Sequence, residues 1–234
     1  MNAPSMNRRQ VVAPPLVGQT ESANDILWIT YRWMSVGLGI TGLVAWLVSQ
    51  SPGVLDVVVG NRLVFYGLFL AQLALVFSFS AVAARASTAV TAAMFFAYAG
   101  LTGLTFSILF LLYTSSSIAS TFLVTGGAFA GLSIFGATTK RDLSTVGRFA
   151  IFALIGLIIA SVVNLFFASS ALLWVTTFAG VLIFAALTAY DTQKLRALYA
   201  AGAGNNLALS GALTLYLDFI NMFLLLLRFS GRRR

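Results

Sequence analysis

The sequence predicts an all-α polytopic membrane protein, a bundle of seven transmembrane helices. Hydrophobic residues make up 59% of the chain and charged residues only 9%, whereas about a quarter of the residues in soluble domains are charged. The mean hydropathy is +0.95, and seven apolar runs are each long enough to cross the ~30 Å hydrocarbon layer as a helix. The runs lack the alternation of a β-barrel, and backbone groups in lipid must pair within their own segment, so helices are expected.

The chain divides into a polar tail, seven apolar runs and a short basic end. Residues 1–24 are polar, contain three of the four prolines and lack an apolar signal segment, which predicts a disordered N-terminal tail and no cleaved signal peptide. The runs cover approximately residues 27–49, 63–84, 88–113, 118–137, 146–168, 171–193 and 207–229, separated by short loops. We therefore expect one transmembrane domain at residues 25–230 and a basic C-terminal tail at residues 231–234.

Two missing residue types exclude several kinds of site. The chain has no Cys, so disulfides and thiolate metal sites are excluded, and no His, so a histidine-dependent serine protease or an HExxH zinc protease has no base or ligand pair. The formal charge is +8, but Lys and Arg stand in short groups between apolar runs. Flanks that follow the positive-inside rule explain this pattern better than a nucleic-acid partner.

The charged loops predict the orientation. In a seven-span arrangement most basic residues between the runs fall on one side, and Arg62 falls on the other. The residues on the first side are Arg8, Arg9, Arg85, Lys140, Arg141, Arg148, Lys194 and Arg196. We expect this side, with the N-terminus, to be cytoplasmic, at the inner membrane if the protein is bacterial. Arg228 and residues 232–234 would then lie outside, against the rule, so six spans with one re-entrant helix stay open as an alternative.

Small residues recur at four-residue spacing, as at Gly127 and Gly131 and at Ser35 and Gly39. Such spacing lets helix backbones approach closely in membranes. We expect these positions to be ordinary packing contacts within the bundle.

Asp218 lies close to the middle of the last apolar run, in LYLDFINMF. A carboxylate at the centre of a transmembrane helix costs about 2.5–3.5 kcal/mol on insertion scales. On a helical period Asp218 shares a face with Gly211, Thr214, Asn221 and Arg228. This polar stripe should face the bundle interior or a water-filled path. A functional role is favoured over the alternative of a structural salt bridge.

Asp191 is placed at the end of the sixth run, in AYDTQKL. Taken alone it fits a helix-end acid beside Lys194, in an i, i+3 pair. Its interest is greater because Asp191 and Asp218 belong to consecutive runs. The sequence alone does not show whether the two side chains meet.

The chain resembles the Bax inhibitor family, also called the transmembrane Bax inhibitor motif family, over approximately residues 25–230. The similar stretches are TGLTFSILFLLYT, GATTKRDLS, YDTQ and, most specifically, LYLDFINMF. The resemblance implies a seven-helix fold with the last helix at the centre and a calcium leak gated by pH. It also implies that Asp191 and Asp218 form a di-aspartyl sensor and that Arg85, close to the end of the second run, is a latch.

The chemistry of two neighbouring carboxyl groups suits such a sensor. In a low-dielectric site both cannot ionise cheaply, so the pair holds one proton and titrates as a unit without any histidine. Arg85 near one acid would favour its ionised form and tie helices together. The two acids would bind Ca²⁺ transiently, with Thr214 and Asn221 as polar residues of the path. We expect no resident cofactor; calcium ions and protons are the species that move.

Three other functions are alternatives to the leak channel. An intramembrane aspartyl protease also uses two Asp on adjacent helices, but the second acid here stands in LYLD rather than GxGD and no PAL-like segment follows, so we expect no enzyme. A non-conducting protein that regulates stress or cell-death responses by binding other membrane proteins is a second alternative. A calcium/proton antiporter is the third.

Overall fold

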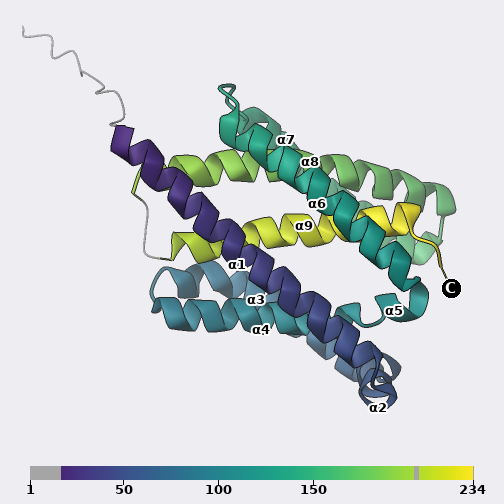
Figure 1. The fold of residues 1–234 in the computed structure, drawn as a ribbon. Coiled ribbons are helices and arrows are strands. Elements are labelled where there is room, and N and C mark those ends of the chain that lie inside the picture. Colours follow the sequence, from purple (N-terminus) through teal and green to yellow (C-terminus); the bar gives the residue numbers. More distant parts are fainter. Residues whose placement is uncertain (1–16, 203–205, 234) are drawn as a thin grey trace, which may run out of the picture.

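The protein, described by a computed structural model at residues 17–202 and 206–233, is a helical bundle (Figure 1). The described residues contain seven helices long and apolar enough to span a membrane. They are α1 (Val17–Ser49), α3 (Arg62–Ala83), α4 (Thr88–Phe106), α6 (Ser115–Thr138), α7 (Ser144–Phe167), α8 (Ser170–Ala200) and α9 (Leu207–Ser230). Three short elements lie between them: α2 (Pro52–Leu55), the π-helical turn η1 (Asp56–Gly60) and α5 (Leu109–Leu112). The predicted all-α polytopic fold is confirmed.

The N-terminal boundary differs from the prediction. Residues 1–16 of the expected disordered tail lie outside the described residues, but residues 17–24, also assigned to that tail, are helical because α1 begins at Val17. No proline follows Pro15 in this segment, so nothing blocks continuation of the helix toward the N-terminus. The part of α1 that is apolar enough to span the membrane begins at Asn24.

Two other runs have unexpected ends. The third run is interrupted by a turn at Ser107 and Ile108 between α4 and α5, where the Ser107 hydroxyl donates to the backbone oxygen of Leu104 (2.7 Å). The sixth helix continues to Ala200, so the placement of Asp191 at a helix end was wrong. Residues 192–200 are mostly good helix formers. At 1.5 Å per residue the 31-residue α8 is about 46 Å long, more than the hydrocarbon layer needs.

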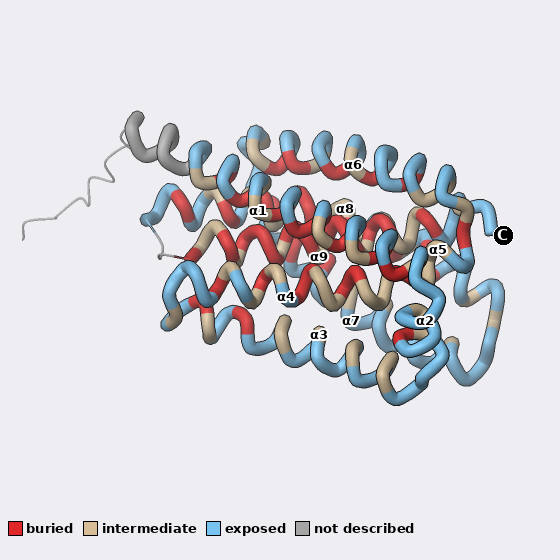
Figure 2. Tube along the Cα trace, turned by 60° about the horizontal axis from the view of Figure 1, so that its bottom comes forward, coloured by how far each residue is buried: buried red, intermediate tan, exposed pale blue. Residues whose placement is uncertain are grey.

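The last helix is the centre of the bundle. In α9, 61% of the most apolar window is buried, against at most 33% in any other span of the described chain. Figure 1 shows α9 between a group formed by α3 and α4 and a group formed by α6, α7 and α8, with α1 crossing over it. In Figure 2 the buried segments concentrate on α9 and on the faces of α1, α4 and α8 turned toward it.

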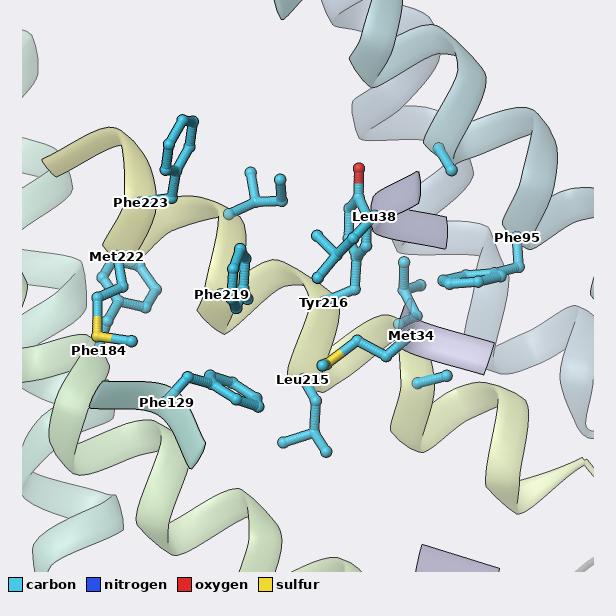
Figure 3. Packing of buried hydrophobic residues seen from close by; sticks show 14 of the residues in the cluster. Met34, Leu38, Phe95, Phe129, Phe184, Leu215, Tyr216, Phe219, Met222 and Phe223 are labelled. Atoms are coloured by element: carbon cyan, nitrogen blue, oxygen red, sulfur yellow. The ribbon is translucent and has the colours of Figure 1, made fainter. Parts of the chain in front are cut away.

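Aromatic side chains fill the space around α9. Tyr216 packs edge-on against Phe95 of α4, with ring centroids 5.9 Å apart, and Phe219 packs edge-on against Phe129 of α6 at 5.5 Å (Figure 3). Such edge-to-face pairs add to the close packing that holds helices together in lipid, where apolar burial alone drives little association.

The close helix contacts are not at the predicted small residues. A Cβ added at Gly39, Gly127 or Gly131 would meet nothing within 4 Å, so these predicted contacts were wrong. The tight contacts lie at other glycines, including Gly37 and Gly103 between α1 and α4 and two glycines that face α8. A Cβ at Gly136 of α6 would clash with the backbone oxygen of Ala189, and one at Gly147 of α7 would clash with the Tyr190 ring. A four-residue spacing of small residues allows two helix backbones to approach closely. The tilt and rotation of each helix decide which of its faces makes the contact.

The end of the chain folds back on the bundle. Arg233 bridges to Tyr113 in an antiparallel pairing, and the Arg232 amide donates to the Ser117 hydroxyl (2.9 Å). The Thr114 amide in turn donates to the backbone oxygen of Arg232 (3.2 Å). In the predicted basic tail, residues 231–233 are therefore tied to the connection between α5 and α6, and Arg234 lies outside the described residues.

Candidate functional site: a carboxyl pair in a cavity

Asp218 is a buried acid at the centre of the bundle. Its side chain is 5% exposed on α9, and its Oδ2 atom has no hydrogen-bond partner among the described residues. Nearly all buried polar groups in proteins are paired, so an exception calls for an explanation. The helix around it is held by aromatic and aliphatic packing, which fixes this carboxyl in place without neutralising it.

Asp191 on α8 reaches the same point. The carboxyl groups of Asp191 and Asp218 are close neighbours that interact electrostatically. Two ionised carboxylates are both acceptors, so a hydrogen bond between them requires one proton on the pair. The charged groups that face Asp191 are Lys194 on its own helix and Asp218. The contacts of α6 and α7 with Ala189 and Tyr190 set the position of α8 directly beside Asp191.

Both acids line one cavity of about 670 Å³ between α7, α8 and α9. Its walls are mainly aliphatic, and its polar residues are Asp191, Asp218, Thr214, Asn221, Ser161 and Arg228. The Thr214 hydroxyl donates to the Ser210 backbone oxygen (3.1 Å) and the Asn221 amide to that of Leu217 (2.8 Å). The hydroxyl lone pairs of Thr214 and the Oδ1 atom of Asn221 therefore remain available as acceptors.

The polar face predicted for α9 is present with one correction. Thr214, Asn221 and Arg228 share the cavity with Asp218, but Gly211 does not line it. A Cβ at Gly211 would be 2.6 Å from the Tyr199 hydroxyl, so Gly211 faces α8. The reason is the level along the helix: Gly211 stands seven residues before Asp218, where Tyr199 and Leu195 of α8 lie against α9.

Arg85 is not brought to the acids in this structure. It is exposed in the turn between α3 and α4, and it is not among the charged groups that face Asp191 or Asp218. The turn itself is attached to the start of α9, because the side-chain amide of Asn206 donates to the backbone oxygens of Ala83 and Ala86 (2.9 Å each). The latch role of Arg85 stays a prediction that this conformation does not display.

Gln193 is a residue that the sequence reasoning missed. Its Oε1 atom accepts from the Leu143 amide and its Nε2 atom donates to the Arg141 backbone oxygen, both at 2.8 Å. The YDTQ stretch therefore holds the TTKRDLS loop at the end of α8 that is nearest the acids. The sequence gives no signal for this bond, since its two partners are about 50 residues apart in the chain.

Asp142, in the same loop, is a different kind of acid. Hydrogen bonds from the side chain and backbone of Ser144 hold the pKa of its carboxyl below the ordinary value, and the group is fully exposed. Asp142 is therefore already ionised at pH values where ordinary carboxyl groups begin to take up protons. It is a poor candidate for a sensor near neutral pH, which leaves the buried pair.

The acid pair can supply part of a calcium site but not a complete one. The described residues contain no cluster of three or more His, Cys, Asp or Glu side chains that could hold a metal. Calcium takes 6–8 oxygen ligands, and the two carboxyl groups with Thr214 and Asn221 offer at most six oxygens, the lower limit of that range. Such a set suits weak binding in which the ion keeps some of its water ligands.

The comparisons with known proteins agree on one family. The chain matches the family described as "Inhibitor of apoptosis-promoting Bax1" over residues 23–234. It is 50% identical over 210 residues to the inner membrane protein YbhL of Escherichia coli K12, covering 87% of this chain and 90% of that protein. An uncharacterized protein of Deinococcus radiodurans is 48% identical over 208 residues, covering 87% and 89%, and one of Borreliella burgdorferi is 40% identical over 216 residues, covering 90% and 93%.

Proposed function

The chain belongs to the Bax inhibitor family, and from this premise we propose that it is a calcium leak channel whose conductance responds to pH through Asp191 and Asp218. One observation carries the proposal: a buried, unpartnered carboxyl oxygen on the central helix faces a second carboxyl within a cavity. A structural salt bridge would instead show a basic partner beside Asp218, and the charged group facing Asp218 is another acid.

The sensitivity of the conductance to pH follows from the electrostatics of the two acids. Protonated, the pair carries less charge and the two carboxyl groups hydrogen-bond each other, which keeps α8 and α9 together at this level. Loss of the shared proton leaves two negative charges in a low-dielectric site, where they repel each other and attract a divalent cation. The cavity wall from α7 carries no charged side chain that could neutralise the acids. Calcium and protons therefore compete for the carboxyl oxygens of the pair. Conductance should therefore change over the pH range in which the pair gains or loses its proton.

The proposal includes an orientation. The protein is an integral multi-pass membrane protein, and its E. coli relative is an inner membrane protein. We place the N-terminus in the cytoplasm because Arg85, Lys140, Arg141, Lys194 and Arg196 lie in turns or helix ends on that side. The resemblance supports transport and not enzymatic chemistry, and no resident cofactor is part of the proposal.

Flux through the purified protein tests the proposal. The protein is reconstituted into vesicles loaded with calcium, and efflux is followed with an external calcium dye from pH 5 to pH 8. A pH-dependent efflux without proton counterflow is expected. Efflux that requires an opposing proton gradient would identify an antiporter, and no efflux at any pH would favour a non-conducting protein that acts by binding other membrane proteins.

A further inference from the structure

The cavity that contains the acids is elongated and reaches the opposite end of α9. Its lining residues extend from Thr214 to Arg228 on α9 and from Ile151 to Leu165 on α7. At 1.5 Å per residue both stretches are about 21 Å long. The acids occupy one part of this length. The remainder is bounded mainly by Leu, Ile and Val side chains, with Asn221 and Ser161 among them and Arg228 at its far end.

The aliphatic part of the cavity opens toward lipid. Several of its α7 residues are well exposed in the protein, including Ile158 (55%) and Leu165 (80%), although they line the cavity. In a membrane-spanning segment such exposed apolar surface is in contact with acyl chains. The aliphatic lining of the cavity is therefore accessible from the lipid side.

The far end of the cavity is basic and aromatic. Arg228 also lines an adjoining hollow of about 140 Å³, together with Arg233 and Trp174. Trp174 stacks on Phe178 (centroids 5.9 Å apart) and lies 6.0 Å from the Phe229 ring. Trp residues gather at the level of the lipid headgroups. No acidic residue lines this hollow, so the two guanidinium groups have a positive field that an anion would complement.

We propose that a phospholipid binds here, with its phosphate on Arg228 and Arg233 and one acyl chain in the cavity between α7 and α9. Arginine recognises phosphate oxygens with two parallel N–H bonds, and the two arginines are placed where a headgroup meets the aliphatic walls. Arg233 is kept at this end because residues 231–233 are tied to Tyr113 and Ser117. The site does not depend on calcium conduction, although a bound chain would lie beside the carboxyl pair.

Binding is tested with purified full-length protein and dipalmitoyl phosphatidylglycerol, measured by native mass spectrometry of the delipidated protein in detergent. The double variant Arg228→Gln, Arg233→Gln should lower the bound fraction at least tenfold at limiting lipid. Arg62→Gln removes an exposed arginine at the start of α3 and should leave binding unchanged. The double variant Arg228→Lys, Arg233→Lys keeps the charge and should bind more lipid than the Gln pair, which separates lost charge from a folding defect.

Two neighbouring isoleucines test the chain pocket. Ile158 lines the cavity and Ile159 does not, yet their exposures are 55% and 59%. Ile158→Trp should block the groove and weaken lipid binding, whereas Ile159→Trp should not. Equal binding by these two variants, or full binding by the Gln double variant, overturns the proposal. Displacement of the lipid by millimolar glycerol 3-phosphate or inorganic phosphate alone would also overturn it, since the site would then recognise only the phosphate.

Discussion

Two polar groups on α9, Tyr216 and Asp218, are both buried but differ in how their hydrogen bonds are satisfied. The Tyr216 hydroxyl lies 2.6 Å from the Thr41 hydroxyl, which itself donates to the backbone oxygen of Ala99 (2.9 Å). Asp218, two residues later, has an Oδ2 atom without a partner among the described residues and a second acid as its neighbour.

The difference distinguishes a structural residue from a candidate functional residue on the same helix. A buried polar group whose bonds are complete stabilises and orders its surroundings, as Tyr216 does by linking α9 to α1 and α4. A buried polar group without a hydrogen-bond partner lowers the stability of the fold, and a bound ligand or proton can relieve this loss. Tyr216 therefore belongs to the scaffold of the bundle, and Asp218 is the group poised to bind.

The largest effect is expected for Asp218→Asn. The carboxamide keeps the shape of the side chain but loses its charge, so the protein should fold and calcium efflux from vesicles should fall at least tenfold at every pH. Helical content and monodispersity in detergent control for folding. Efflux equal to that of the unmodified protein would remove Asp218 from the ion path.

Asp191→Asn should move the pH midpoint of residual efflux. When the neighbouring negative charge is removed, Asp218 ionises more easily, so the midpoint moves to lower pH. The measurement is efflux against pH in both variants and in the unmodified protein. A midpoint that stays in place would mean that the two acids titrate independently.

Tyr216→Phe should affect stability and leave the pH response unchanged. It removes one buried hydrogen bond while Thr41 keeps its backbone acceptors, so the expected loss is about 0.5–1.5 kcal/mol. Thermal unfolding in detergent measures this change. A shifted efflux midpoint in Tyr216→Phe would contradict the division, because the scaffold residue would then act on the sensor.

Arg85→Ala should give the smallest effect. Arg85 is exposed and does not face the acids, and substitutions at such positions usually change free energies by 0.5 kcal/mol or less, which is about twofold. A several-fold rise in efflux at neutral pH would instead support the latch role, in a conformation where the turn between α3 and α4 approaches α9. The matched control is Arg62→Ala, at the opposite end of α3.

The sequence predicted the elements well because partition into lipid is decided locally. The seven runs match the seven long helices closely, since a stretch of some 20 apolar residues must span as a helix wherever its neighbours lie. Asp218 could be found by the same reasoning, because a lone carboxyl in an apolar run is costly in any bundle. The shared face of Asp218, Thr214, Asn221 and Arg228 followed from helical periodicity alone.

Only the tertiary structure shows which residues of different helices are in contact. The contact of Asp191 with Asp218, the bond from Gln193 to the loop before α7 and the close approach of Gly136 to Ala189 all join residues far apart in the chain. Hydropathy cannot reveal them, because most faces of these transmembrane helices are apolar enough to meet either lipid or protein. Tilt and rotation, set by side-chain packing between helices, determine which acid faces which, and so turn two separate carboxyl groups into one site.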